Sequence, residues 1–323
     1  MGHFELVSEL RARHRVLAEV ARELGALPRR LSWALGLHGY LLNMYLAQMG
    51  LPLEDALVDE GLAIAEGFGF TDLRLHQLNS RLVRGCFSGS VALFEPMRAE
   101  TNDLIRRLGT PRLLDKNLSL FLPIYYLERR EFEHAAAAAD KLTKLVDVIP
   151  TDRWLKLYAA IAVACTQAAT DKAKALVSLP AAITAATEAG FRLQSYARAT
   201  LARLLAGTSD KAGAVDAADL ALARATDPVT ASPFDEILAR RARAAAVPAA
   251  AKDELTRAIE LARASQGTLQ EGICHLELAR ATVDVDRAAA AQSVERAEAL
   301  FVAVAAPQWV EEIALFRRQV SAK

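Results

Sequence analysis

Apolar residues recur every three or four positions along most of the chain, which is the spacing of one face of an α-helix. Leucine, valine and alanine side chains form such a face over residues 4–24. Gly25 ends this pattern, and Pro28 opens a second helix that runs to about Gln48, since proline is well tolerated in a first helical turn. A partner helix follows over 53–66. No run of alternating β-branched or aromatic residues predicts a strand, so the sequence indicates an all-α protein.

Helix-start signals recur at regular intervals after this point. Thr71, Thr110 and Thr151 each precede an apolar-periodic helix, where a hydroxyl can cap free backbone N–H groups. They are 39 and 41 residues apart (71 to 110, and 110 to 151). Further starts are expected at about Gly190, Ser232, Thr268 and Ala306, and second helices near Ser90, Glu131, Asp171, Asp210, Ala249 and Val285.

A period of about forty residues with two helices in each period is typical of a helical solenoid. One hairpin cannot bury its own apolar face, so neighbouring hairpins stack and share a core. The sequence therefore predicts an all-α, right-handed α-solenoid of about eight helical hairpins. We expect residues 1–323 to form one domain, with 1–50 as candidate N-terminal capping helices.

The segment 124–148 gives the clearest hairpin. Tyr126, Phe132 and Ala135 stand at relative positions 0, 6 and 9 across its turn. We expect the Tyr126 ring to plug the helix pair, Phe132 to close the turn, and the small Ala135 to let the two helices touch.

These three residues resemble the tetratricopeptide-repeat superfamily, and Ala56 and Ala63 match the seven-residue spacing of alanines in that family's second helix. The period of about forty exceeds the family's usual thirty-four, as in the repeat region of MalT-like, LuxR-type regulators and related signalling ATPases. The resemblance covers nearly the whole chain as a pattern. It implies a superhelix whose concave face recognises a partner and a role in regulation.

Charge and cysteine usage narrow the class of protein. Lys plus Arg equals Asp plus Glu at 39 each, whereas a nucleic-acid-binding protein would show a basic excess or stripe, so direct nucleic-acid binding is not expected. The three cysteines are dispersed and odd in number, which fits neither a disulfide framework nor a zinc site and favours a reducing cytoplasm. The N-terminus has no apolar signal core, and the longest uncharged stretch, 157–170, is too short to span a membrane.

Motifs that carry chemistry are absent from the sequence. It contains no phosphate loop, no HExxH and no GxSxG, so neither an ATPase module nor a metalloprotease or serine hydrolase is indicated. Glu131 and His134 form one ExxH, but a di-iron bundle needs two. The six histidines are dispersed, and His38 and His275 are expected to be core residues. The sequence thus predicts no catalytic residue, no metal and no cofactor.

Polar side chains of the first helix of each hairpin are the candidate binding residues, because these helices line the concave face of such solenoids. Tyr, Asn and Arg side chains there would suit an extended peptide or a polar small molecule. The candidates are His76, Asn79, Arg81, Arg84, Asn117, Tyr125, Tyr126, Lys156, Tyr158, Gln194, Tyr196 and Arg198.

These observations leave three hypotheses open. The leading one is a non-enzymatic interaction or effector-sensing module that binds a protein, a peptide or a small effector, with self-association as a further option. The second is a peptide-responsive regulator that resembles response-regulator phosphatases, in which residues 4–48 would form a separate small bundle. The third is an all-α enzyme whose site would show titratable groups of perturbed pKa in a deep pocket.

Overall fold

The computed structural model describes residues 3–24, 28–109, 119–191 and 193–321. Within these ranges the chain forms sixteen α-helices, one 3₁₀ turn and no β-strand, which confirms the predicted all-α class. In chain order the elements are α1 (His3–Leu24), α2 (Arg29–Gln48), α3 (Asp55–Phe68), α4 (Thr71–Ser88), α5 (Val91–Leu108), α7 (Leu122–Glu128), α8 (Phe132–Val148), α9 (Arg153–Thr170), α10 (Lys172–Glu188), α11 (Gln194–Ala206), α12 (Lys211–Thr226), α13 (Pro233–Ala246), η1 (Pro248–Ala250), α14 (Ala251–Ala264), α15 (Thr268–Thr282), α16 (Arg287–Ala303) and α17 (Pro307–Ser321).

Second helices begin where the sequence predicts them. Ser90, Glu131, Asp171 and Asp210 are the N-cap residues of α5, α8, α10 and α12. The Asp171 and Asp210 carboxylates accept hydrogen bonds from backbone N–H groups three residues ahead, at 3.2 and 2.9 Å. Polar caps of this kind stop a helix pair from merging into one long helix, because they satisfy the free N–H groups of a new helix.

The expected threonine caps of the first helices are wrong where they can be checked. Thr71 is already the first residue of α4, whose N-cap is Phe70. Asp152 rather than Thr151 caps α9, and its carboxylate accepts from Leu155 N at 2.9 Å. Thr110 lies outside the described residues. An ionised carboxylate is the stronger acceptor beside a hydroxyl one residue away, which explains the shift at α9.

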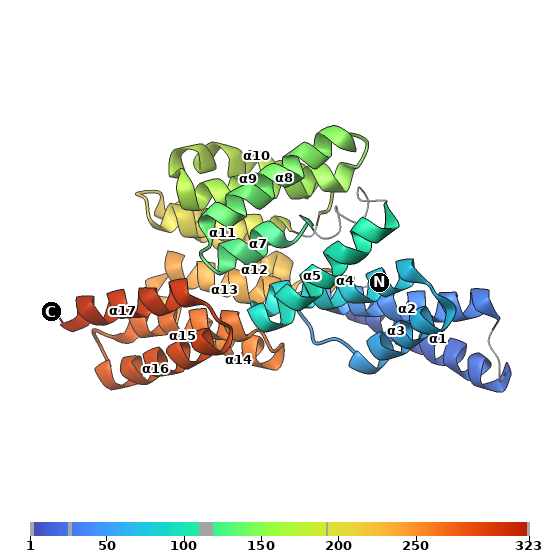
Figure 1. Cartoon of the computed structure of the whole chain (residues 1–323). Coiled ribbons are helices and arrows are strands. Elements are labelled where there is room, and N and C mark those ends of the chain that lie inside the picture. Colours follow the sequence, from blue (N-terminus) through green and yellow to red (C-terminus); the bar gives the residue numbers. More distant parts are fainter. Residues whose placement is uncertain (1–2, 25–27, 110–118, 192, 322–323) are drawn as a thin grey trace.

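Except between α5 and α7, each described helix packs against the next one along the chain, and several first helices of successive hairpins also touch each other. Examples are α2 with α4, α9 with α11, and α11 with α13. In Figure 1 the chain runs from α1–α3 at the lower right, through α4 and α5 to α7–α10 at the top of the view, and back down through α11–α13 to α14–α17 at the lower left. The late helix α15 thereby comes into contact with α4.

The hairpin α7–α8 matches its predicted boundaries, and its small residue lies at the helix contact. Ala135 has no exposed surface, and Tyr126 is buried with its hydroxyl accepting a hydrogen bond from Arg98 Nη1 at 2.9 Å. Phe132 is the first residue of α8. A buried alanine at a helix contact allows close approach of the two backbones.

Replacing Ala135 by leucine should lower the free energy of unfolding by about 1–3 kcal/mol, because three added heavy atoms must be accommodated in a packed contact. Urea titration followed by circular dichroism measures this. Ala136→Leu is the matched control, since Ala136 is exposed one position away on the same helix. Equal stability of the two variants would mean that Ala135 is not at a tight helix contact.

Two buried arginines join the early hairpins to the late ones. Arg84, on α4, donates hydrogen bonds to the backbone carbonyls of Gly50 (3.0 Å), Ser265 (2.5 Å) and Gln266 (3.1 Å). Arg129, just after α7, donates to those of Gly89 (2.8 Å), Val304 (3.1 Å) and Ala305 (2.5 Å). The contacted turns are one repeat apart on both sides, 50 to 89 and 265 to 304. The same contact is thus made twice, between segments 175 to 182 residues apart in sequence.

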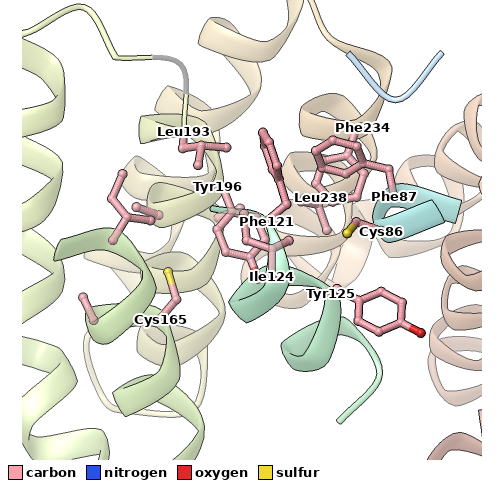
Figure 2. Close-up of a cluster of buried hydrophobic side chains, with 14 of the residues drawn as sticks. Cys86, Phe87, Phe121, Ile124, Tyr125, Cys165, Leu193, Tyr196, Phe234 and Leu238 are labelled. Atoms are coloured by element: carbon pink, nitrogen blue, oxygen red, sulfur yellow. The ribbon is translucent and has the colours of Figure 1, made fainter. Parts of the chain in front are cut away.

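Glycines bring the facing turns into direct contact. Gly50 and Gly89 have φ of 75° and 74°, a left-handed conformation that suits glycine. A Cβ atom at Gly50 would lie 2.8 Å from Phe234 Cβ, and one at Gly89 would lie 2.4 Å from Leu269 Cβ. The Phe87 and Phe234 rings meet beside these turns with centroids 4.5 Å apart, as Figure 2 shows. The first helices α4, α13 and α15 therefore pack against each other rather than face an open groove.

Within the described residues, no helix combines the length and apolar character that crossing a membrane requires.

Candidate functional site

A pocket of about 480 Å³ opens where the first helices α7, α9, α11, α13 and α17 come together. Its walls are formed by the ends of α7, α9 and α11, the starts of α8 and α10, one side chain of α13 and the start of α17. The volume lies in the usual range for small-molecule sites. The apolar and aromatic side chains that line it include Leu127, Phe132, Cys165, Leu204 and Trp309.

Glu128 and Arg241 form the base of this pocket. Arg241 Nη1 donates to Glu128 Oε2 at 3.1 Å and to Gln270 Oε1 at 2.7 Å, and Gln270 Nε2 donates to the same Glu128 oxygen at 3.0 Å. Tyr196 Oη donates to Glu128 Oε1 at 3.2 Å. Both Glu128 oxygens are therefore occupied by neighbouring side chains. One residue at the end of α7 thus links helices α11, α13 and α15.

A second carboxylate completes the charge balance around Arg241, which is almost fully buried. Glu277, on α15, accepts from Arg241 Nε at 3.1 Å and from Nη2 at 2.9 Å, a bidentate pair. Burial alone lowers the pKa of Arg241, but Glu277 and Glu128 outweigh it and raise that pKa. Burial likewise raises the pKa of Glu277, and Arg241 and Arg203 reverse this and lower it. Arg241 and Glu277 are therefore charged at neutral pH, and Arg241 makes its hydrogen bonds to Glu277, Glu128 and Gln270.

Trp309 forms the wall contributed by the C-terminal helix. Its indole Nε1 donates to the backbone carbonyl of Glu128 at 2.7 Å, and its ring stacks on Phe301 with centroids 5.4 Å apart. The guanidinium carbon of Arg130 lies 5.1 Å from the Trp309 ring centroid and 5.7 Å from that of Phe132. Arg130 also pairs with Glu312 at 3.3 Å. The pocket is thus bounded partly by a residue about 180 positions away in sequence from its base.

Two side chains that line the pocket, Cys165 and Tyr196, have raised pKa values. Burial raises the pKa of the Cys165 thiol to about 12, so it is a thiol and not a nucleophilic thiolate at neutral pH. Burial and the neighbouring Glu128 hold the pKa of Tyr196 well above its ordinary value. Both side chains therefore act as neutral wall and hydrogen-bonding groups near pH 7.

Of the binding residues predicted from the sequence, those on α4 serve packing and ion pairing. His76 stacks on Tyr40 with centroids 4.7 Å apart, and Asn79 is buried. Arg81 pairs with Asp59 at 2.6 Å. Arg84 contacts backbone carbonyls, as described above. None of the four lines the pocket.

The remaining predicted residues are spread over several environments, and among those that the structure describes only Tyr196 lines the pocket. Tyr125 stacks on Phe94, Tyr126 accepts from Arg98, and Tyr158 lies half-buried between the Phe121 and Phe191 rings. Gln194 and Arg198 each hydrogen-bond the Thr187 hydroxyl, at 3.1 and 3.0 Å. Lys156 is exposed on α9, and Asn117 lies outside the described residues. The structure therefore does not gather these side chains into one surface.

The pocket residues Glu128, Arg241 and Trp309 were not singled out from the sequence. Their neighbours in sequence give no local signal, because each is a polar or aromatic residue of a first helix like many others. Their partners are 29 to 181 residues away in the chain.

Among the described residues, no group of three or more His, Cys, Asp or Glu side chains could hold a metal ion. The ExxH carboxylate has a structural partner, since Glu131 Oε1 accepts from Arg129 Nε at 2.8 Å. His134 lies 3.4 Å from the other Glu131 oxygen and is largely exposed.

No protein-family model matches this chain, and a search of curated proteins finds no match either. The function is therefore inferred from the pocket itself.

Proposed function

We propose that this protein is a non-enzymatic effector-sensing module that binds a small molecule in the pocket between α7, α9, α11 and α17. The observation that carries the proposal is the pocket's position at the junction of early, middle and late repeats. A ligand there would touch Leu127, Arg203 and Trp309 at once. Buried networks and a thiol with a raised pKa favour binding over catalysis.

Binding at this junction would affect the contact between the C-terminal helix α17 and α7. Trp309 belongs to α17, and Glu128, whose carbonyl it contacts, belongs to α7. A ligand that binds only the closed arrangement stabilises it by mass action, by RT ln(1 + [L]/Kd). Ligand occupancy would thereby set how firmly the C-terminal helix is held against the rest of the molecule.

The small-effector hypothesis is favoured over an extended peptide groove. Peptide recognition on a concave face needs first-helix side chains that are available to a partner. Here Arg84, Arg129 and Arg241 donate hydrogen bonds to carbonyls and carboxylates of the protein itself, so they are not available to a peptide. A protein partner would then recognise the outer surface in its ligand-bound or ligand-free form.

The similarity of the hairpins to tetratricopeptide-like regulators supports a regulatory role, and the proposal places the protein in the cytoplasm. Cys86, Cys165 and Cys274 are all buried free thiols, which fits a reducing compartment.

A pocket-filling variant tests the proposal. Ala169 lines the pocket and is exposed, so Ala169→Trp should occupy the binding volume without disturbing the core. In a thermal-shift screen of a metabolite library, a true effector should raise Tm by about 2 °C or more well above its Kd. The shift should vanish in Ala169→Trp.

Ala173→Trp is the matched control, because Ala173 is exposed at the start of α10 and does not line the pocket. Its shift should equal that of the natural chain. If every compound that stabilises the natural chain also stabilises Ala169→Trp, the pocket is not the effector site and the proposal is wrong.

A further inference from the structure

The charges that line the pocket are unequal in number. Arg130, Lys172, Arg203 and Arg241 are cationic, and Glu128 is the carboxylate among the lining residues. Arg241 and Glu128 are committed to each other and to Gln270, Glu277 and Tyr196 within the base. The net charge that a ligand would encounter in the pocket therefore depends on Arg130, Lys172 and Arg203.

Arg203 has a weak partner. It stands in the last turn of α11, where a cation interacts favourably with the helix dipole. Its ion pair with Glu277 is long, at 3.8 Å, and the same Glu277 oxygen already accepts from Arg241 Nη2 at 2.9 Å. The Arg203 side chain is 43% exposed. Its guanidinium thus keeps donors that an incoming oxyanion can use.

Lys172 occupies a position that local helix stability does not explain. It is exposed, it lines the pocket, and it is the first residue of α10, where a cation is unfavourable with respect to the helix dipole. The nearby Asp171 carboxylate is already used, because it caps α10 and pairs with Lys174 at 3.3 Å. The Lys172 side chain therefore adds a positive charge to the pocket lining.

Part of the pocket lining is apolar. Phe132, Leu127 and Leu204 contribute to it, and Arg130 is held between the Phe132 and Trp309 rings and by Glu312. A ligand that matches both the cationic and the apolar lining carries an oxyanion and a compact apolar or aromatic body.

We propose that the effector is a small organic anion whose carboxylate or phosphate is bound by Arg203 and Lys172, with its apolar body against Phe132 and Leu204. This inference rests on the proposed function, and it adds the chemical class of the ligand. Arg203 can offer two parallel N–H donors to an oxyanion, and Lys172 adds a point charge.

Four probes that share a phenyl ring separate the contribution of the ligand's charge from that of its apolar body. Benzoate and phenyl phosphate carry the two kinds of oxyanion, benzamide is neutral, and benzylamine is cationic. The indole N–H signals in ¹⁵N-labelled protein report binding, with the Trp309 signal assigned through Trp309→Phe. At least one of the two anions should shift the Trp309 signal with a Kd of about 1 mM or tighter, since the ligand is small. Benzamide should bind about tenfold more weakly or worse. Whichever anion binds more tightly identifies the headgroup.

Charge-neutral variants test the two cations. Arg203→Gln and Lys172→Gln should each weaken anion binding about tenfold, the loss expected for one charge-assisted hydrogen bond. Arg198→Gln and Lys174→Gln are matched controls on the same helices, since neither residue lines the pocket. Both controls should leave the Kd unchanged.

The outcomes separate this inference from the proposed function. Equal binding of benzamide or benzylamine, blocked by Ala169→Trp, would overturn the anionic ligand and leave the effector pocket standing. Anion binding that Arg203→Gln and Lys172→Gln leave unchanged would also overturn it, as would no anion binding to about 20 mM, well beyond the expected Kd. Failure of the proposed function is recognised separately, by a library screen without any compound that Ala169→Trp blocks.

Discussion

Replacing Arg241 by leucine is expected to lower the free energy of unfolding by about 3–5 kcal/mol at neutral pH, the largest effect among the substitutions considered. The reason is that the two carboxylates paired with Arg241 would remain without it. Glu128 and Glu277 would keep their places beside buried groups but lose the cation that offsets their desolvation. Breaking a buried pair by removing one member leaves an uncompensated charge, which costs far more than losing the pair as a whole.

The pH dependence of the variant should have the opposite sign to that of the natural chain. In the natural chain the folded-state pKa of Glu277 lies below its ordinary value of 4.5, so its contribution is present above that pH and is lost on acidification. Without Arg241, burial raises the pKa of Glu277, and its contribution is then lost as the pH rises through the folded-state pKa. The difference in stability between variant and natural chain should therefore be smaller at about pH 5 than at about pH 7.

Urea unfolding at the two pH values measures this difference. Arg257→Leu serves as the control, because Arg257 is more than half exposed and pairs with an equally exposed Glu260. Adding Glu128→Gln and Glu277→Gln to Arg241→Leu should recover part of the lost stability. A single Arg241→Leu variant as stable as the control would show that the network at the pocket base does not hold the repeats together.

Arg129→Met should weaken the closure between early and late hairpins, with a loss of about 3 kcal/mol or more. Methionine keeps the apolar stem, but the carbonyls of Gly89, Val304 and Ala305 lose a donor, and Glu131 loses its ion pair with Arg129. A buried acceptor left unsatisfied costs about 1–3 kcal/mol.

The location of the damage is as informative as its size. Hydrogen–deuterium exchange should rise at the turns around 89–90 and 304–309, which Arg129 ties together, and much less in α9 and α10. Arg81→Met is the control, because the Asp59 carboxylate that Arg81 pairs with is largely exposed. Exchange that rises uniformly along the chain would mean that Arg129 stabilises its own hairpin and not the closure.

The sequence alone was sufficient for the helices. Apolar spacing predicted α1 to within one residue at its start, and the second-helix starts at Ser90, Glu131, Asp171 and Asp210 coincide with N-caps. These features depend on residues three or four apart, so their signals lie within one short window. Where two polar residues compete for one role, as at Thr151 and Asp152, local pattern did not decide between them.

The candidate site, unlike the helices, was not predicted from the sequence. Of the eleven predicted residues that the structure describes, only Tyr196 lines the pocket, and Arg84 contacts a carbonyl of a hairpin 181 residues away. A polar residue on a first helix gives the same sequence pattern whether it faces a ligand, solvent or another repeat. Which of these it faces depends on how far the stack of hairpins curves before it meets itself.

The sequence by itself therefore determined the class of fold, the positions of the hairpins and the helix contact at Ala135. Only the tertiary structure decided that the early and late hairpins contact each other and that Arg84 and Arg129 form hydrogen bonds across this contact. It also decided that Glu128, Arg203 and Trp309 line the same pocket. The physical reason is the distance along the sequence over which each effect acts. Helix periodicity and capping act over a few residues, whereas the curvature of a solenoid is the sum of small packing angles at every interface, and no single residue encodes it.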